Sequence, residues 1–326
     1  MGTLSLPSVR KLLYNQNGNQ VWQHYSQGGV LEEVQLLHRE PFVVTSSGVN
    51  YLLTSNENLD IFNQYEYILL VTKQPKSKDL EAGTIRVKRW LKHPKFETLS
   101  PTQVLSSWGN KFKFIQEDEA NNIKGLRPPQ MGALYSILSH LQNPEDKGIV
   151  VMPTGTGKTE TMLATLISNK CKKLLVSVPS DSLRTQISEK FITLGLLKEY
   201  GIVDEDCHNP IVGIMNSSIT DIAILRDFIS RVNVVVTTMD ILTDSTAEAK
   251  TLYSQEFSHL FVDEAHHSEA QTWKELIDRF DKEKVFLFTA TLYRNDGKNL
   301  QGKIIFNFSL RKAQEQRYYK PHFLLS

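Results

Sequence analysis

The sequence has few cysteines, no excess of charge of either sign and no long apolar run. Only two of its 326 residues are cysteine, Cys171 and Cys207, which argues against a disulfide framework and suits a reducing compartment. The 37 basic and 36 acidic residues leave a net charge of +1, so a nucleic-acid partner would need a local binding surface. No apolar stretch reaches about 18 residues, the length of a membrane-spanning helix. We therefore expect a cytoplasmic protein with no membrane segment.

The length favours two domains, since one domain usually takes about 100–200 residues. In residues 1–120 we expect a small mixed α/β domain, which could contact nucleic acid or another partner. Its predicted strands are 43–44, 51–53 and 67–72, and a short helix is predicted at 101–108. The polar segment 117–124 indicates a linker.

The segment Arg86–Phe96 interleaves basic and aromatic side chains. Such a run could hold phosphates and stack a base, chiefly through Trp90 and Phe96. The alternative is a solvated amphipathic surface with Trp90 in the core.

From residue 125 onward, apolar segments alternate with segments of helical periodicity. We expect strands at 148–152, 173–178, 211–215, 233–237, 259–262 and 285–288, and helices at 130–141, 158–169, 182–194, 219–229 and 270–280. Apolar strands separated by helices predict an α/β fold with a mostly parallel sheet that is buried on both faces. Ligands of such sheets lie at the carboxyl ends of the strands.

Residues 152–159, Met-Pro-Thr-Gly-Thr-Gly-Lys-Thr, follow one of these strands and precede a helix. Glycines at 155 and 157 let the backbone wrap a phosphate, while the helix N-terminus attracts an anion. Lys158 can reach the β and γ oxygens, and the Thr159 hydroxyl can bind Mg²⁺. Met152 stands where the general pattern has glycine, a variant that nucleic-acid motors use. The segment predicts an ATP–Mg²⁺ site; the alternative is a glycine turn that binds nothing.

A second candidate element is the run His259–His267, in which an apolar strand ends in two acidic residues, Asp263 and Glu264. At that position Asp263 can hold Mg²⁺, and Glu264 can orient and deprotonate a water aimed at the γ-phosphate. The alternative is an Asp that caps the next helix. Because a zinc-binding HExxH spacing is absent, we expect His266 to act in coupling and His267 to lie at the surface or in packing.

Together, Met152–Thr159 and Asp263-Glu264-Ala265-His266 resemble the DEAH-type helicases and translocases of superfamily 2. The Asp-Glu-Ala-His-His form is closest to restriction-enzyme motor subunits and related DNA-dependent ATPases. The resemblance implies a RecA-like domain over residues 121–308. It also implies that Gln130 reads adenine, although the family often has an aromatic residue where Pro129 stands. Nucleotide contacts would further include the following residues: Arg127, Thr154, Gly155, Thr156, Gly157, Lys158 and Thr159.

The same resemblance assigns contacts to nucleic acid. Val178–Gln186, with Ser180 and Arg184, and Thr237-Thr238 resemble the two motifs that track the strand backbone. Hydroxyls and helix N-termini suit backbone phosphates and read no sequence, so these motifs by themselves cannot separate RNA from DNA. The resemblance to restriction-enzyme motors and DNA-dependent ATPases favours DNA, and an RNA helicase stays open. Thr289-Ala290-Thr291 resembles the motif that couples hydrolysis to movement, and Arg294–Gly297 continues that branch's pattern.

Motors of this family use two RecA-like domains, and the second supplies arginines that stabilise charge on the transferred phosphoryl group. Residues 309–326 resemble the link to that second domain, and the sequence contains no Q-x-x-G-R-x-x-R segment. We therefore expect the front portion of a longer motor, with weak or no turnover by itself and with possible defence-system partners. The alternative function is a binding module whose affinity ATP switches, with recognition by residues 1–120.

Overall fold

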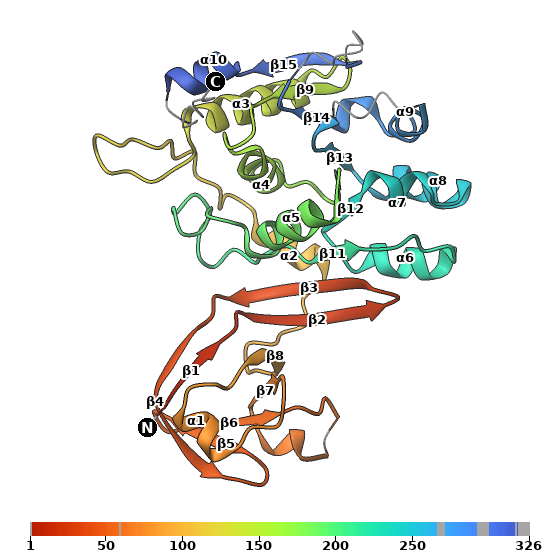
Figure 1. Ribbon diagram of the computed structural model, residues 1–326. Coiled ribbons are helices and arrows are strands. Elements are labelled where there is room, and N and C mark those ends of the chain that lie inside the picture. Colours follow the sequence, from red (N-terminus) through yellow and green to blue (C-terminus); the bar gives the residue numbers. More distant parts are fainter. Residues whose placement is uncertain (1, 59, 266–270, 292–299, 317, 319–326) are drawn as a thin grey trace, which may run out of the picture. The chain divides into compact units, whose positions relative to one another are not determined.

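The computed structural model describes residues 2–58, 60–265, 271–291, 300–316 and 318. The chain divides into two compact units: unit 1 comprises Met1–Leu13 and Trp22–Leu99, and unit 2 comprises Tyr14–Val21 and Ser100–Ser326 (Figure 1). Among the described residues, no helix is both long and apolar enough to cross a membrane.

Unit 1 is built on a six-stranded sheet in the order β1-β4-β5-β6-β7-β8. Only β6 and β7 are parallel, and every other neighbouring pair in this sheet is antiparallel. Its elements are β1 (Gly2–Leu6), β4 (Gly29–His38), β5 (Val43–Ser46), β6 (Val49–Thr54), a 3₁₀ turn (Asp60–Gln64), β7 (Tyr67–Val71), α1 (Ser77–Glu81) and β8 (Val87–Lys92). The three predicted strands of this region are confirmed as β5, β6 and β7.

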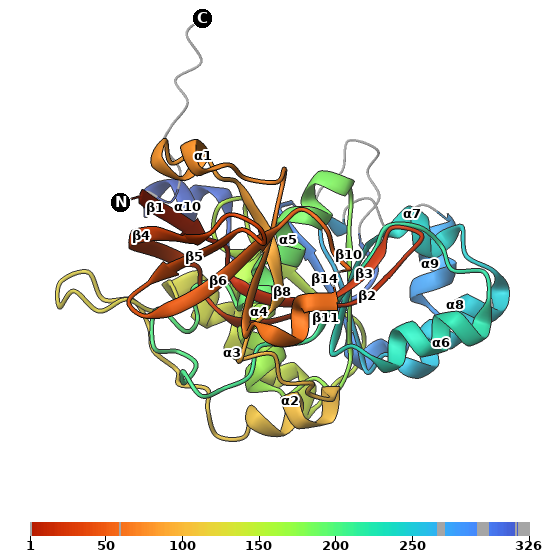
Figure 2. The ribbon, with the colours of Figure 1, turned by 90° about the horizontal axis from the view of Figure 1, so that it is seen from below.

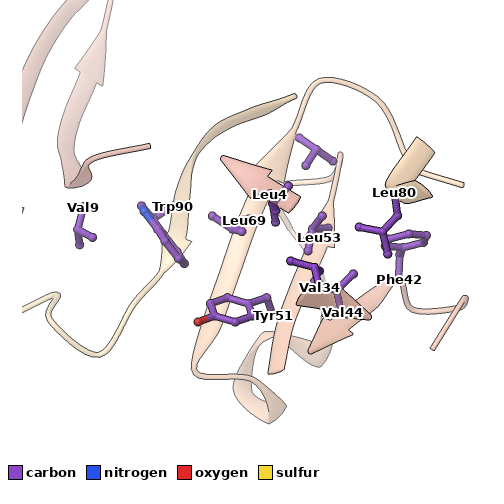
Figure 3. Close-up of a cluster of buried hydrophobic side chains, with 11 residues drawn as sticks. Leu4, Val9, Val34, Phe42, Val44, Tyr51, Leu53, Leu69, Leu80 and Trp90 are labelled. Carbon is purple, nitrogen blue, oxygen red and sulfur yellow. The ribbon is translucent and has the colours of Figure 1, made fainter. Parts of the chain in front are cut away.

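Alternation along the strands gives this sheet two apolar faces. In β6, Tyr51 and Leu53 join one buried cluster, and Leu52 between them joins the other. Figure 3 shows the larger cluster, in which Leu53 and Leu69 from neighbouring strands pack near Leu4.

Trp90 belongs to the larger cluster of unit 1. It is 3% exposed, and its Nε1 donates a hydrogen bond to the carbonyl of Pro7 at 3.0 Å. A buried ring cannot stack on a base. The core alternative for Trp90 is therefore confirmed, and its predicted role in base stacking is wrong.

Unit 2 contains a parallel sheet in the order β15-β9-β14-β13-β10-β12-β11, which β3 and β2 continue beyond β11. Its strands are β9 (Gly148–Val151), β10 (Leu174–Val178), β11 (Val212–Met215), β12 (Val234–Thr238), β13 (His259–Val262), β14 (Val285–Thr289) and β15 (Lys303–Asn307). The six strands predicted from residue 125 onward are confirmed, and β15 is an additional strand.

The helices of unit 2 lie on both faces of its sheet, with α3, α4 and α5 on one face and α6 to α9 on the other (Figures 1 and 2). They are α2 (Pro101–Ser107), α3 (Pro128–Gln142), α4 (Lys158–Ser168), α5 (Asp181–Thr193), α6 (Ile222–Ser230), α7 (Met239–Thr243), α8 (Ala247–Glu256), α9 (Gln271–Ile277) and α10 (Leu310–Glu315), with a 3₁₀ turn at Lys282–Lys284. This cover explains why β9, β10, β12, β13 and β14 are buried along their whole length.

The boundary between the units lies at Leu99–Ser100, before the expected boundary at residue 120. Residues 100–120 pack within unit 2 instead. Trp108 is 1% exposed and donates from Nε1 to the carbonyl of His208 at 2.9 Å, and Lys113 N donates to the carbonyl of Ile202 at 2.7 Å. The expected linker at 117–124 is a hairpin of unit 2, closed by a bridge between Asp118 and Ile123.

The β2–β3 hairpin (Val9–Gln16 and Asn19–Ser26) has its tip, Tyr14–Val21, in unit 2. Asn19 is 2% exposed, and its Oδ1 accepts hydrogen bonds from the backbone N–H groups of Asn216 at 2.7 Å and Ser217 at 3.1 Å. Part of the N-terminal sequence is therefore integral to unit 2.

Candidate active site

The loop after β9 makes a tight turn at the N-terminus of α4. Gly155 and Gly157 have φ angles of +85° and +97°, a region that favours glycine. The Thr156 hydroxyl and N–H both donate to the Pro153 carbonyl, at 2.6 and 3.2 Å. Thr156 is buried and stabilises the turn from inside, whereas Thr154, Gly155 and Gly157 face a cavity.

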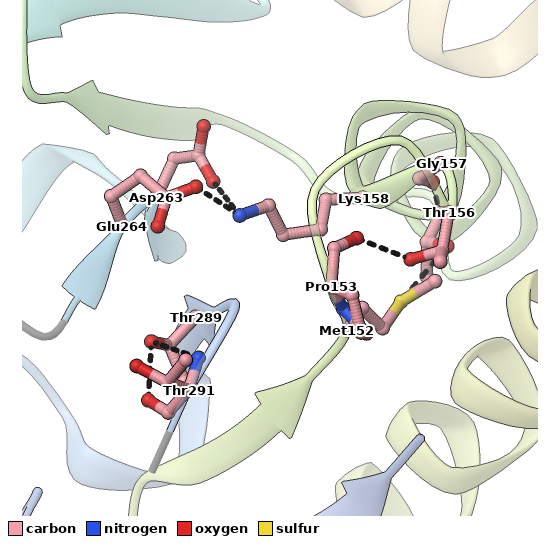
Figure 4. A network of polar contacts seen from close by, with 10 residues as sticks. Met152, Pro153, Thr156, Gly157, Lys158, Asp263, Glu264, Thr289 and Thr291 are labelled. Carbon is pink, nitrogen blue, oxygen red and sulfur yellow. Dashed lines mark hydrogen bonds and ion pairs between the residues drawn. The ribbon is translucent and has the colours of Figure 1, made fainter. Parts of the chain in front are cut away.

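Lys158, the first residue of α4, lies between this loop and the end of β13. Its ammonium contacts Glu264 Oε1 and lies 3.7 Å from Asp263 Oδ1 (Figure 4). The side chain is almost fully buried, where an unpaired charge would be costly, and the two carboxylates compensate its charge. The structure thus brings together three residues predicted to be catalytic, although Lys158 is more than a hundred positions from the two carboxylates in sequence.

The two carboxylates are held where β13 ends. Asp263 N donates to the Ser177 carbonyl of β10 at 2.8 Å, and Glu264 has a φ angle of +50°. Burial raises the pKa of Asp263, the Lys158 charge lowers it, and the Glu264 charge raises it. Asp263 Oδ1 is buried and makes no hydrogen bond.

This oxygen, which pairs with the Lys158 ammonium but accepts no hydrogen bond, fits a divalent cation. Mg²⁺ takes oxygen ligands and is usually held by one or two carboxylates together with substrate phosphates. Thr159 lines the same cavity and offers a hydroxyl oxygen. Within the described residues, no group of three or more His, Cys, Asp or Glu side chains is arranged to hold a metal ion. The donor set fits an ion carried with a nucleotide.

The N-terminus of α3 is tied to the phosphate loop. Gln130 Oε1 accepts from Arg127 N at 2.7 Å, and its Nε2 lies 3.5 Å from the Gly157 carbonyl. Arg127 Nη1 donates to the Gly155 carbonyl at 3.2 Å. Gln130, which is predicted to read adenine, and Arg127, which is predicted to contact the nucleotide, therefore line the same cavity as Lys158.

The cavity has a volume of about 540 Å³ and extends beyond all the predicted nucleotide residues. Its further wall consists of residues that the sequence analysis did not assign to nucleotide binding: Glu117, Gly125, Leu126, Glu160, Leu183, Gln186, Ile187, Lys190, Leu196, Leu197, Tyr200 and Ile202. On α5, the spacing of Leu183, Gln186, Ile187 and Lys190 places one helix face toward the cavity, a periodicity visible in the sequence. Lys190 Nζ pairs with Glu160 Oε1 of α4 at 2.5 Å.

The residues expected to contact nucleic acid differ in exposure. The Ser180 hydroxyl caps α5 by accepting from Leu183 N at 3.4 Å. Arg184 is 7% exposed and pairs with Asp181, and Thr237 is fully buried with its hydroxyl donating to the Met215 carbonyl at 3.1 Å. Thr238, at the end of β12, is buried too. Among these four, Ser180 is the least buried in this structure.

The expected coupling motif connects directly with the phosphate loop. Met152 N donates to the Thr289 carbonyl at 2.9 Å. The Thr289 hydroxyl donates to the Thr291 carbonyl at 2.8 Å (Figure 4). The start of the phosphate loop and the end of β14 are thus joined by a backbone hydrogen bond. His266 and Arg294–Gly297 lie outside the described residues.

Comparison with known proteins yields one family and several solved structures to which the chain is similar. The sequence pattern of the type III restriction enzyme, res subunit, matches residues 123–294. The chain is similar to the UvsW helicase from bacteriophage T4, with 17% identity, 60% of this chain and 62% of that chain covered, and a TM-score of 0.37. No curated protein matches the chain.

Two further similar structures were solved with DNA. One is the Sulfolobus solfataricus SWI2/SNF2 ATPase core in complex with dsDNA, with 17% identity, 58% and 36% covered, and a TM-score of 0.41. The other is a nuclease-deletion mutant of the Type ISP restriction-modification enzyme LlaGI in complex with a DNA substrate mimic, with 19% identity, 61% and 21% covered, and a TM-score of 0.40. The chain spans from 21% to 62% of the length of these three structures.

Proposed function

The chain belongs to the family of the type III restriction enzyme res subunit, and from this we propose that it is the ATP-binding motor core of a DNA helicase or translocase in restriction or phage defence. The observation that carries the proposal is the meeting of Lys158, Asp263 and Glu264 at one cavity beside a phosphate-shaped loop. We also infer a cytoplasmic setting, which suits the two free, buried cysteines.

Each residue of the site has a distinct part in this proposal. The loop N–H groups and Lys158 would bind the triphosphate, and Thr159 and Asp263 would hold Mg²⁺, which neutralises charge on the phosphates when bound. Lys158 would exchange Glu264 for a phosphate oxygen. That exchange would free the Glu264 carboxylate to accept a proton from a water.

Coupling and strand contact follow from the neighbouring strand ends. The Met152–Thr289 hydrogen bond would pass loop movement to β14, and Ser180 would meet the nucleic-acid backbone. Fast hydrolysis would require a second RecA-like domain with its arginines.

The first test is calorimetric binding of ATP–Mg²⁺ to the wild type, to Lys158→Ala and to Lys303→Ala. Lys303 is a matched control, because it is an exposed lysine paired with Glu145 and does not line the cavity. We expect Lys158→Ala to weaken binding by at least about tenfold, or 1.4 kcal/mol, and Lys303→Ala to leave it unchanged. Equal affinities in all three proteins would refute the proposed site.

The second test is ATP turnover by the full-length protein with double-stranded DNA, single-stranded DNA and RNA. We expect DNA to stimulate turnover and Glu264→Gln to lower it by about 10²–10⁴-fold, since that substitution removes the general base. Stimulation by RNA alone would favour an RNA helicase. ATP binding without turnover in any condition would favour the nucleotide-switched binding module.

A further inference from the structure

The lining of the cavity of the proposed nucleotide site has two parts of different chemistry. The polar part is formed by the phosphate loop, Lys158 and the two carboxylates. The apolar part comes from α5 and the segment that follows it, and it consists of Ile187, Leu196, Leu197, Tyr200 and Ile202. A triphosphate would use the polar part and would leave the apolar part without an occupant.

The segment 194–202 is a closed loop with its own hydrogen bonds. It begins with Leu194 and Gly195 in the left-handed region, at φ of +60° and +54°, where α5 ends. Within it, Tyr200 N donates to the Leu196 carbonyl at 3.0 Å and Ile202 N donates to the Leu197 carbonyl at 2.9 Å. These bonds fix the position from which Tyr200 reaches the cavity.

The Tyr200 ring is further held from the outside. Lys124 Nζ lies 5.5 Å from the ring centroid and 3.4 Å from Glu199 Oε1. An ammonium near an aromatic ring attracts it, so Lys124 restrains the ring. A restrained aromatic ring loses little conformational entropy when a flat ligand stacks on it.

We propose that Tyr200, with Leu197 and Ile202, forms the wall that binds the base of the nucleotide, and that the Tyr200 ring stacks on that base. This inference rests on the proposed nucleotide site and assigns a role to the apolar part of its lining. Aliphatic side chains and an aromatic ring suit the faces of a purine, while Gln130 and the Glu117 carboxylate, which also line the cavity, suit the edges. An exocyclic amino group of the base is a hydrogen-bond donor, and the Glu117 carboxylate can accept its hydrogen bond.

The test compares ATP with inorganic tripolyphosphate, which has the phosphates without the base. Calorimetric dissociation constants are measured with Mg²⁺ for the wild type, Tyr200→Ala, Tyr200→Phe and Tyr135→Ala. Tyr135 is the matched control, because this tyrosine on α3 is 52% exposed and does not line the cavity.

We expect Tyr200→Ala to weaken ATP binding by about 5- to 150-fold, the equivalent of 1–3 kcal/mol of stacking, and to leave tripolyphosphate binding unchanged. Tyr200→Phe keeps the ring and should bind ATP like the wild type, as should Tyr135→Ala. If Tyr200→Ala weakened the binding of ATP and of tripolyphosphate equally, or weakened neither, the proposed base wall would be overturned. Equal wild-type affinity for ATP and tripolyphosphate would also overturn it, whereas a wild type that binds neither ligand overturns the proposed function itself.

Discussion

The two units of this chain differ in the relative direction of their strands. The β9–β15 sheet of unit 2 is parallel, so its carboxyl ends share one edge and bring Lys158, Asp263 and Thr289 close together in space. The sheet of unit 1 is mainly antiparallel, so its strands end at alternate edges. Residues that follow its strands are dispersed.

The side chains that cluster in unit 1 are apolar or aromatic. The His93 ring centroid lies 4.7 Å from that of Trp90 and 5.2 Å from that of Tyr67, in edge-to-face geometry. These rings pack against one another, while the polar residues of unit 2 line a cavity. The comparison teaches that strand topology decides whether polar residues distant in sequence can form one site.

The largest expected effect tests the boundary between the units. Trp108→Ala and Trp90→Ala each remove a buried indole and should each lower the free energy of unfolding of their own unit by about 3–5 kcal/mol. Hydrogen exchange resolved by peptide is the measurement. We expect Trp108→Ala to speed exchange in β10 and not in β6, and Trp90→Ala to do the reverse. If Trp108→Ala instead sped hydrogen exchange in β6, then α2 and Trp108, which directly follows it, would belong to unit 1.

The next effect compares two glycines of the phosphate loop. Both have positive φ, so an alanine costs about 1–2 kcal/mol at either position. At Gly157 the added Cβ would also meet the Gln130 side chain, whereas at Gly155 nothing lies within 4 Å. We expect Gly157→Ala to weaken ATP binding by at least about tenfold more than Gly155→Ala in calorimetry. A stronger effect from Gly155→Ala would mean that the Gln130 contact is unimportant.

A smaller effect concerns the hairpin tip of unit 2. Asn19→Ala leaves the N–H groups of Asn216 and Ser217 without their acceptor and should destabilise unit 2 by about 1–3 kcal/mol. Asn50, an exposed asparagine of β6, is the control, and its alanine variant should stay within about 0.5 kcal/mol of the wild type. Faster exchange in β11 for the Asn19 variant alone is the expected result. If hydrogen exchange in β11 stayed unchanged, the hairpin tip would not be an integral part of unit 2.

The smallest effect is the acid sensitivity of unit 2. Burial, with the Lys284 charge, lowers the pKa of His259 to about 4 from 6.5, so between those values the unfolded chain binds a proton that the folded unit does not. Stability is therefore fully present above pH 6.5 and falls as the pH drops toward 4, by at most about 1.4 kcal/mol per pH unit. Measured denaturation curves for His259→Gln should show a shallower slope in that window.

Unit 1 offers the comparison for this pH effect. Burial and Lys95 lower the pKa of His93 to about 4 as well, but His93 is partly exposed, and solvent screening reduces its contribution. Removing His93 should change the slope less than removing His259. A larger change from His93→Gln would contradict that ranking.

The sequence by itself determined the strands, the main helices and the ATP-site motifs of unit 2. The strands β9 to β14 are continuous apolar segments, and the loop 152–159 carries its residue types in fixed order, so both are local patterns. The family match confirms the resemblance drawn from these motifs. The nucleotide and nucleic-acid roles of single residues stay predictions.

Only the tertiary structure decided the unit boundary, the place of the hairpin tip and the second wall of the cavity. Trp108 and Asn19 belong to unit 2 through hydrogen bonds to residues far along the chain, which no local periodicity encodes. Tyr200 lies in a loop whose composition is ordinary, and it reaches the cavity because α5 ends beside α4. Local sequence fixes which element forms, whereas the packing of elements fixes which side chains share a site.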